Sequence, residues 1–437
     1  MIILKGGLCV DPESGMEAKK DIIIDGEIIT AIEDDIDTDA WISGASDGVE
    51  VYDCNGLIIG PGIVDGHVHF RDPGFTYKED IYSGAAAAAA GGVTSVILMA
   101  NTKPVVDSVD TLKYVLDKGR ETDIAVYSCA SITKGLEGRE LTDMENLKAH
   151  GAIAFTDDGI PILSENVISA AMQEAARLGV VLSFHEEDPK YIENNGINRG
   201  KASEHFGLGG SDRQAEISMV KRDIELAVKY GCKINIQHIS TKEAVGLIRE
   251  AKREGHGDLI FAEATPHHMS MTELDTIRYG TYAKMNPPLR TEEDRQAIID
   301  GLADGTIDMI ATDHAPHSDE EKNRPIDKAP SGIIGLETSL SVSYNTLIVS
   351  NMLSWVQLFC KLSLNPARIY GIDAGKLAIY RTADIVLFDP NMIQKFDKTR
   401  SKSFNSPLKN SEITGGVVGT IRAGRKIYDK MAKRRLT

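Results

Sequence analysis

Apolar segments alternate with helix-like stretches through most of this chain, and that alternation limits the folds open to it. Eight short apolar segments can be counted, and most are followed by helical periodicity, as in 216–230 and 241–255. Eight strand–helix units predict a TIM (β/α)8 barrel with insertions. A doubly wound sheet is the alternative fold, but no GxGxxG motif follows the first segment. The eight predicted strands lie near residues 57–69, 93–100, 124–131, 152–157, 179–185, 232–238, 258–264 and 307–313.

Both ends of the chain carry short β segments instead of this alternation. They are separated by turn signals such as Gly6-Gly7 and Asp25-Gly26. Because chain termini often lie close together, we predict one small β domain from residues 1–56 and 375–437, with the barrel in 57–374. The segments that carry this prediction are residues 2–4, 21–24, 27–32, 383–388 and 415–425.

Composition and charge exclude several classes of partner. The 437 residues are 42% hydrophobic and carry a formal net charge of −17, which argues against a nucleic-acid groove or an anionic membrane surface. The five cysteines are scattered without a CxxC pair, which predicts free thiols in a reducing cytoplasm. No apolar run reaches about 18 residues, so we expect no membrane span. The Ala-rich run 85–90 predicts a helix packed closely on a sheet.

Metal-type residues fall at the ends of the predicted strands. His67 and His69 end the first strand, and residues i and i+2 of a strand point to the same face. The C-terminal strand ends of a TIM barrel form its catalytic face, so these side chains are expected to converge. Four histidines and one or two aspartates form a zinc-type ligand set. The other members are Asp157 and Asp158 after strand four, His185 after strand five, His238 after strand six and Asp313 after strand eight.

Taken singly, each of these residues has an ordinary interpretation. A lone histidine such as His185 or His238 is more often a hydrogen-bonded loop residue, and Asp157-Asp158 before a glycine is typical of a turn. Their common position at strand ends favours the metal site. Arg71, in the loop after His69, is suited to gripping a carboxylate, which predicts an anionic substrate.

Several motifs together resemble class I dihydroorotases of the bacterial and archaeal type, within the amidohydrolase superfamily. The likeness covers nearly the whole chain, and the pairing of HxHxRDPG with ATDHAPH is specific, whereas HxH alone marks only the superfamily. The matching pieces are DGHVHFRDPG at 65–74, ANTKP at 100–104, FTDDG at 155–159, HIST at 238–241, KMNPPLR at 284–290, ATDHAPH at 311–317, GLET at 335–338 and NPARIYG at 365–371.

The resemblance implies a role for each matching residue. His67, His69 and Asp313 look like ligands of a first metal, and His185 and His238 look like ligands of a second. Many superfamily members bridge the metals with a carbamylated lysine after strand four, a place that Asp158 takes here. Asp157 remains an alternative, because a one-residue register change turns a side chain to the other face. The implied substrate-binding residues are Arg71, Asn101 and His317 for a carboxylate, and Asn286, Ser331 and Gly332 for a pyrimidine ring.

The implied activity is the reversible hydrolysis of dihydroorotate to N-carbamoyl-L-aspartate in de novo pyrimidine biosynthesis. The resemblance implies one or two Zn²⁺ ions, metal-bound hydroxide as nucleophile and Asp313 as general acid and base. Two alternatives remain: an allantoinase or hydantoinase, whose neutral ring would leave Arg71 without a carboxylate, and a scaffolding subunit with little activity of its own. The partners to test are a second copy of the chain and aspartate transcarbamoylase.

Overall fold

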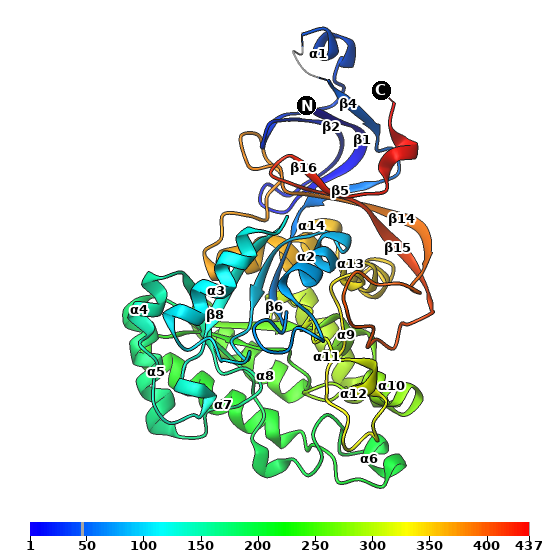
Figure 1. Cartoon of the computed structure of the whole chain (residues 1–437). Helices are drawn as coiled ribbons and strands as arrows, with labels where there is room; N and C mark the ends of the chain where they lie inside the picture. Colours follow the sequence, from blue (N-terminus) through cyan, green and yellow to red (C-terminus); the bar gives the residue numbers. More distant parts are fainter. Residues whose placement is uncertain (45–47, 437) are drawn as a thin grey trace.

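The computed structural model describes residues 1–44 and 48–436, in which two eight-stranded sheets stand out (Figure 1). One sheet is parallel, with its strands in sequence order from β6 to β13. A parallel bridge between Val68 and His314 joins its two ends, so the sheet forms a nearly closed barrel and confirms the predicted fold. Its strands are β6 (Ile63–Val68), β7 (Val93–Leu98), β8 (Ala125–Ala130), β9 (Ala152–Thr156), β10 (Val181–Phe184), β11 (Lys233–Ile236), β12 (Ile260–Ala264) and β13 (Met309–Ile310).

Helices lie between these strands in the sequence and bury one face against the barrel. In α8, for example, Ala244, Val245, Ile248 and Ala251 are buried at helical spacing in the main hydrophobic core. The helices of the barrel region are α2 (Ile81–Ala90), α3 (Val109–Arg120), α4 (Met144–Ala149), α5 (Glu165–Leu178), α6 (Lys201–Phe206), α7 (Gln214–Tyr230), α8 (Lys242–Ala251), α9 (Pro266–Ser270), α10 (Glu273–Tyr279), α11 (Glu292–Asp304), α12 (Asp319–Lys322), α13 (Ser339–Ser343), α14 (Trp355–Phe359) and α15 (Asn365–Tyr370).

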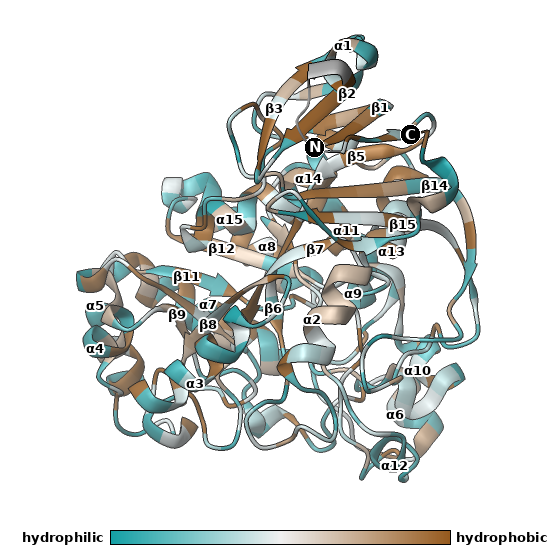
Figure 2. Ribbon diagram, turned by 45° about the horizontal axis from the view of Figure 1, so that its top comes forward, coloured by the Kyte–Doolittle hydropathy of each residue, from teal (hydrophilic) through white to brown (hydrophobic). Residues whose placement is uncertain are grey.

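The second sheet combines strands from both ends of the chain, as predicted. Its strand order is β16-β15-β14-β5-β1-β2-β3, with β4 also paired to β1. Figure 2 shows hydrophobic stretches in β1, β2 and β3, and Ile2, Ile22 and Ile29 of these strands belong to a core separate from the main one of the barrel. A division into two domains near residues 57 and 375 stays a prediction. The elements outside the barrel are β1 (Ile2–Asp11), β2 (Met16–Asp25), β3 (Ile28–Glu33), α1 (Thr38–Gly44), β4 (Glu50–Asp53), β5 (Ile58–Pro61), β14 (Ile385–Lys395), β15 (Glu412–Arg422) and β16 (Arg425–Asp429).

The apolar run 57–69 is two strands and not the single barrel strand that the sequence suggests. Its first half, β5, pairs with β1 and β14 in the small sheet, and its second half, β6, begins the barrel. The break falls at Gly62, whose amide donates to the carbonyl of Asp384. A side chain at Gly62 would collide with Thr94, since a Cβ there would lie 2.2 Å from its hydroxyl oxygen.

The Ala-rich run forms α2, which packs between the two sheets. Its small side chains let the helix lie close to β7 and β15, and the carbonyl of Ala89 accepts a hydrogen bond from the Thr420 hydroxyl at 2.7 Å. Val386 and Val417 of the small sheet belong to the same core as the barrel helices. Within residues 1–44 and 48–436, no helix combines the length and apolarity that crossing a bilayer requires.

Candidate active site

The C-terminal ends of the barrel strands bring six predicted metal ligands together. His67 lies on β6 and His69 just beyond it, so strand alternation turns both rings to one face. The backbone amide of His69 donates to the carbonyl of His314 at 2.9 Å, which fixes this strand end where the barrel closes. The others follow β9, β10, β11 and β13, namely Asp158, His185, His238 and Asp313.

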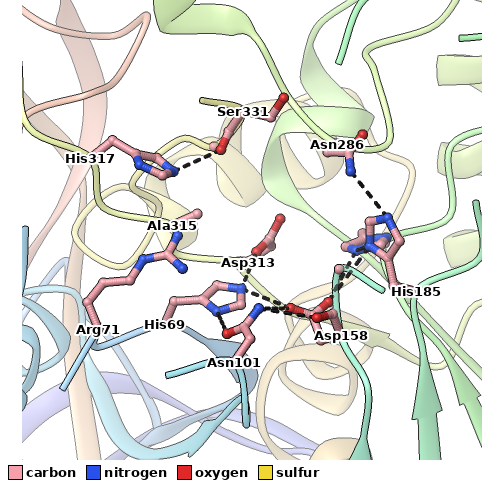
Figure 3. Close-up of a pocket in the computed structure, with 13 residues that line it drawn as sticks. His69, Arg71, Asn101, Asp158, His185, Asn286, Asp313, Ala315, His317 and Ser331 are labelled. Carbon is pink, nitrogen blue, oxygen red and sulfur yellow. Dashed lines mark hydrogen bonds and ion pairs between the residues drawn. The ribbon is translucent and has the colours of Figure 1, made fainter. Parts of the chain in front are cut away.

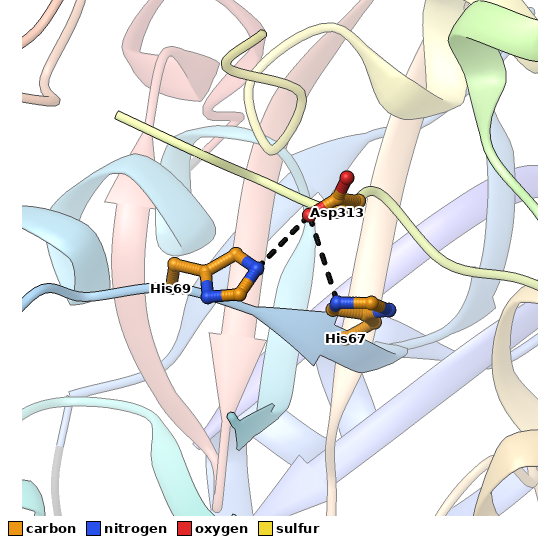
Figure 4. A group of neighbouring side chains, drawn as sticks. All are labelled: His67, His69 and Asp313. Carbon is orange, nitrogen blue, oxygen red and sulfur yellow. Dashed lines mark hydrogen bonds and ion pairs between the residues drawn. The ribbon is translucent and has the colours of Figure 1, made fainter. Parts of the chain in front are cut away.

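The first group is His67, His69 and Asp313 (Figure 4). Oδ1 of Asp313 lies 3.0 Å from Nε2 of His69 and 3.6 Å from Nε2 of His67. Two ligand atoms on a tetrahedral metal, each about 2.1 Å from the ion, lie about 3.4 Å apart. These separations therefore suit atoms that share one ion.

The second group is His67, Asp158 and His238. Oδ1 of Asp158 lies 3.6 Å from Nε2 of His67 and 4.0 Å from Nε2 of His238. His185 adjoins this group, since its Nδ1 lies 3.8 Å from the same Asp158 oxygen and 3.0 Å from Nε2 of His238. Because His67 and Asp158 adjoin both groups, the two would be neighbouring positions in one centre.

The donor set fits a divalent cation. Nε2 of His67 is buried and has no hydrogen-bond partner within the described residues, although two carboxylates lie near it. An unpartnered buried ring nitrogen is costly, and a metal ion would satisfy it. Imidazole nitrogens together with carboxylate oxygens are the ligands of catalytic zinc and related metals.

The electrostatics of the centre also favour positive charge. Burial alone would raise the pKa of Asp158, but His67, His69 and His185 hold it well below its usual range. Burial alone would lower the pKa of His67, but Glu263, Asp313 and Asp158 raise it well above its usual range. The buried carboxylates therefore stabilise a cation at this position.

Two carboxylates that the sequence analysis missed orient the histidine rings. Oε1 of Glu263, on β12, lies 2.5 Å from Nδ1 of His67, and Oε2 of Glu187 lies 3.0 Å from Nε2 of His185. Such contacts fix the ring tautomer and aim the other nitrogen at a metal. One signal was available for Glu263: it interrupts the apolar segment 258–264, where an unpaired acid would be costly.

The structure separates the two neighbouring aspartates after β9. Oδ1 of Asp157 accepts the backbone amides of Ile132 at 2.8 Å and Thr133 at 3.0 Å, and its other oxygen accepts the Thr133 hydroxyl. Asp157 therefore supports the loop after β8, and Asp158 is the residue that lies in the cluster.

A cavity of about 210 Å³ opens beside the cluster (Figure 3). All six predicted substrate residues line it, with Asp158, His185, His238 and Asp313 in its wall. Arg71 and His317 lie on one side, and Asn286 lies on the other beside His185. The substrate residues are Arg71, Asn101, Asn286, His317, Ser331 and Gly332.

These six residues differ in how free they are to meet a ligand. Arg71 forms no ion pair with any described residue, and Nε of its guanidinium donates a long hydrogen bond to the Pro316 carbonyl, at 3.4 Å. Asn101 is engaged with the cluster, since its Oδ1 lies 2.9 Å from Nδ1 of His69 and its Nδ2 donates to Asp158 at 2.8 Å. Oδ1 of Asn286 is buried and accepts no hydrogen bond from the part of the chain that the structure describes.

The opposite edge of the cavity is hydrogen-bonded internally. Nε2 of His317 donates to the carbonyl of Ser331 at 2.9 Å. Burial lowers the pKa of His317 to about 3, so the ring is neutral at ordinary pH. The amide of Gly332 donates to the carbonyl of Lys284 at 2.9 Å. A Cβ at Gly332 would lie 2.8 Å from the Ala315 Cβ, which explains the glycine.

Three residues of this site have a strained backbone. Arg71, His238 and Asp313 have positive φ angles of 57°, 29° and 44°. Each such conformation costs on the order of 1–3 kcal/mol in a residue other than glycine and persists only where surrounding contacts enforce it. The strain turns the three side chains into the cavity or the cluster.

Comparison with known proteins agrees with this geometry. Residues 56–244 match the family model described as dihydro-orotase-like. The chain is 49% identical to a dihydroorotase of Clostridium acetobutylicum over 98% of this chain and 100% of that one, and 49% identical to a dihydroorotase of Clostridioides difficile at the same coverage. A dihydroorotase of Lactococcus lactis is 43% identical over 98% of this chain and 99% of its own length.

Solved structures establish the fold more widely. An L-hydantoinase (dihydropyrimidinase) from Arthrobacter aurescens superposes with a TM-score of 0.85 at 24% identity, over 98% of this chain and 96% of that one. A dihydropyrimidinase from Brevibacillus agri gives a TM-score of 0.83 at 20% identity. At such identities the likeness concerns the fold alone.

The family assignment rests on the full-length relatives, and the converging His/Asp cluster with the cavity beside it agrees with it. This chain is a member of the dihydroorotase family, a cyclic amidohydrolase of the amidohydrolase superfamily.

Proposed function

We propose that this chain catalyses the reversible hydrolysis of dihydroorotate to N-carbamoyl-L-aspartate. The observation that carries the proposal is one cavity with two complementary walls. One wall holds the Arg71 guanidinium, which has no ion-pair partner among the described residues, and the other holds a His/Asp cluster containing Asp313. Dihydroorotate carries a carboxylate for the first wall and a cyclic amide for the second.

The proposed cofactor is Zn²⁺, as one or two ions. His67, His69 and Asp313 would hold one position, and Asp158, His185 and His238 would hold or share the other. When bound, the metal supplies Lewis acidity toward the amide carbonyl and lowers the pKa of water from 15.7 to about 7. The donor types favour zinc among available metals but also accept manganese or cobalt.

Asp313 is the proposed general base and acid. Its Oδ1 faces His67 and His69, whereas its Oδ2 accepts no hydrogen bond from the described residues. In the hydrolytic direction Oδ2 would take a proton from the attacking water as the new C–O bond forms. It would return that proton to the ring nitrogen as the C–N bond breaks.

Arg71 and Asn286 are proposed to orient the substrate. A guanidinium can meet a carboxylate through two parallel N–H···O bonds, which fixes the ring relative to Asp313. Oδ1 of Asn286 is a buried acceptor to which no described residue donates, and a ring N–H of dihydroorotate would supply the missing donor. Asn101, His317, Ser331 and Gly332 complete the proposed binding surface.

Hydantoinase or allantoinase activity is the competing function. A neutral ring would leave the half-buried Arg71 guanidinium without a carboxylate to pair with, so we expect dihydroorotate to be preferred. The test is metal analysis of the purified chain alongside turnover of dihydroorotate, hydantoin and allantoin. Dihydroorotate turnover with bound zinc supports the proposal, whereas turnover of only the neutral rings would refute it.

The proposed compartment is the cytoplasm, and two associations are proposed with it. All five cysteines are free thiols, in keeping with a reducing compartment. Association with a second copy or with aspartate transcarbamoylase rests on the family resemblance. Light scattering of the chain alone, and assays with and without the transcarbamoylase, test both. Full activity of the isolated chain would refute a purely scaffolding role.

A further inference from the structure

A loop of the small sheet reaches the rim of the active-site cavity. Residues 396–411 connect β14 to β15, and Figure 1 shows this connection leaving the small sheet and passing down beside the barrel toward α12. Asn405, within the loop, is completely buried. The loop contributes no residue to the metal cluster or to the cavity lining described above.

The side chain of Asn405 joins two segments that form one edge of the cavity. Its Nδ2 donates to the carbonyl of Ala315 at 2.9 Å and to that of Gly332 at 3.0 Å. Its Oδ1 accepts the backbone amide of His317 at 3.0 Å. Ala315, His317 and Gly332 all line the cavity. The Asn405 side-chain amide therefore connects two segments that line the cavity, although Asn405 does not line it itself.

Other polar groups fix the same edge, which makes its position precise. The Gly332 carbonyl also accepts Nζ of Lys322 at 3.0 Å, and the same ammonium donates to the Pro330 carbonyl at 2.9 Å. On the cavity side, His317 bonds the Ser331 carbonyl. Asn405 and Lys322 therefore both donate to the Gly332 carbonyl oxygen. Lys322 fixes the Pro330–Gly332 backbone, and Asn405 also connects it to the Ala315–His317 segment.

The loop does not depend on Asn405 for its attachment to the barrel. The Thr399 hydroxyl and the Arg400 backbone amide donate hydrogen bonds to the Glu337 carboxylate. The Lys402 backbone amide donates to the Glu79 carboxylate at 3.1 Å. A buried amide costs desolvation that several exposed tethers would avoid. The burial of Asn405 is better explained by the hydrogen bonds that its side chain forms with the cavity edge.

We propose that Asn405 is a positioning residue that sets the spacing between the Ala315–His317 and Ser331–Gly332 edges, and so controls substrate affinity rather than proton transfer. The inference rests on the proposed function, since dihydroorotate is the ligand whose fit it would govern. It also assigns the connection between β14 and β15 a part in substrate specificity.

The test compares N405D with T399V in the full-length, metal-loaded enzyme. N405D keeps the Oδ1 acceptor but points a carboxylate oxygen at two carbonyls, whereas T399V removes a loop tether remote from the cavity. We expect N405D to raise KM for dihydroorotate at least about tenfold with kcat changed less than about threefold and metal content unchanged. T399V should keep both constants within about twofold.

A second variant removes the other side-chain hydrogen bond to the Gly332 carbonyl, the one that Lys322 donates. K322M should also raise KM selectively, and it decides the matter if N405D does not fold. An unchanged KM in N405D, or an equal rise in T399V, would overturn the inference. Wild-type protein without dihydroorotate turnover would instead refute the proposed function, so the two failures are distinguishable.

Discussion

Nδ1 of His67 lies 2.5 Å from Oε1 of Glu263, a carboxylate that is completely buried on β12. The contact links the first and seventh strands of the barrel across its interior. Glu263 also accepts Nδ2 of Asn235 at 3.0 Å, so its own position is fixed. It therefore holds the His67 ring with Nε2 directed at Asp158 and Asp313.

E263Q should weaken metal binding about tenfold or more, because the neutral amide is a poorer acceptor for the His67 N–H. The measurement is competition for the metal with a chromophoric chelator. E273Q is the matched control: Glu273 is also buried, but it bonds Asn198 and Ala202 and no cluster residue. Equal metal affinity in E263Q and the wild type would remove Glu263 from the centre.

D313N should lower turnover of dihydroorotate roughly a hundredfold or more while most of the metal is retained. The amide can still contact the cluster but cannot carry the proton between water and ring nitrogen. Steady-state kinetics with metal analysis make the comparison, and D157N is the control because Asp157 faces the Thr133 loop. Near-normal kcat in D313N would exclude the proposed acid–base role.

R71K should raise KM for dihydroorotate roughly 10- to 100-fold and change kcat much less. The lysine ammonium is a point charge, whereas the guanidinium can donate two parallel hydrogen bonds to a carboxylate. Initial-rate measurements over a wide substrate range resolve the two constants. R324K, at an exposed arginine, should leave both unchanged. If KM in R71K matched the wild type, the carboxylate would have to bind elsewhere.

Much of this site follows from local pattern. The spacing of His67 and His69, together with acidic or imidazole residues after strands four, five, six and eight, is enough to predict the cluster because barrel strands all end on one face. The cavity likewise contains every residue expected to meet substrate. The sequence pattern does not predict which hydrogen-bond partner each polar atom has. Asn101, for example, is engaged with His69 and Asp158.

Long-range contacts account for the remaining differences. The run 57–69 divides at Gly62 because its first half pairs with β14, whose residues lie more than 300 positions later. Asn405 hydrogen-bonds to Gly332 and Ala315, which lie 73 and 90 positions earlier in the chain. No pattern in the sequence around residue 405 predicts these contacts. Glu187 resembles any acid in the polar stretch that follows β10. Only the folded chain shows that it faces His185.

Lys322 makes stability depend on pH in a predictable direction. Its ammonium is fully buried against the Pro330 and Gly332 carbonyls and forms no ion pair within the described part of the chain. Burial, with the nearby charge of Lys284, lowers its pKa from 10.5 to about 7. Between these two values the unfolded chain binds more protons than the folded one, so this group makes folding more favourable as pH rises from about 7 toward 10.

The wild type should therefore gain thermal stability relative to K322M as pH is raised from 7 to 9. The gain in unfolding free energy is at most about 1.4 kcal/mol per pH unit, because a single proton is involved. Melting temperatures of both metal-loaded proteins, taken at each pH and subtracted, isolate Lys322 from the other groups that titrate. A difference that stays constant across this range would mean that the folded ammonium keeps its ordinary pKa, and that polar surroundings offset its burial.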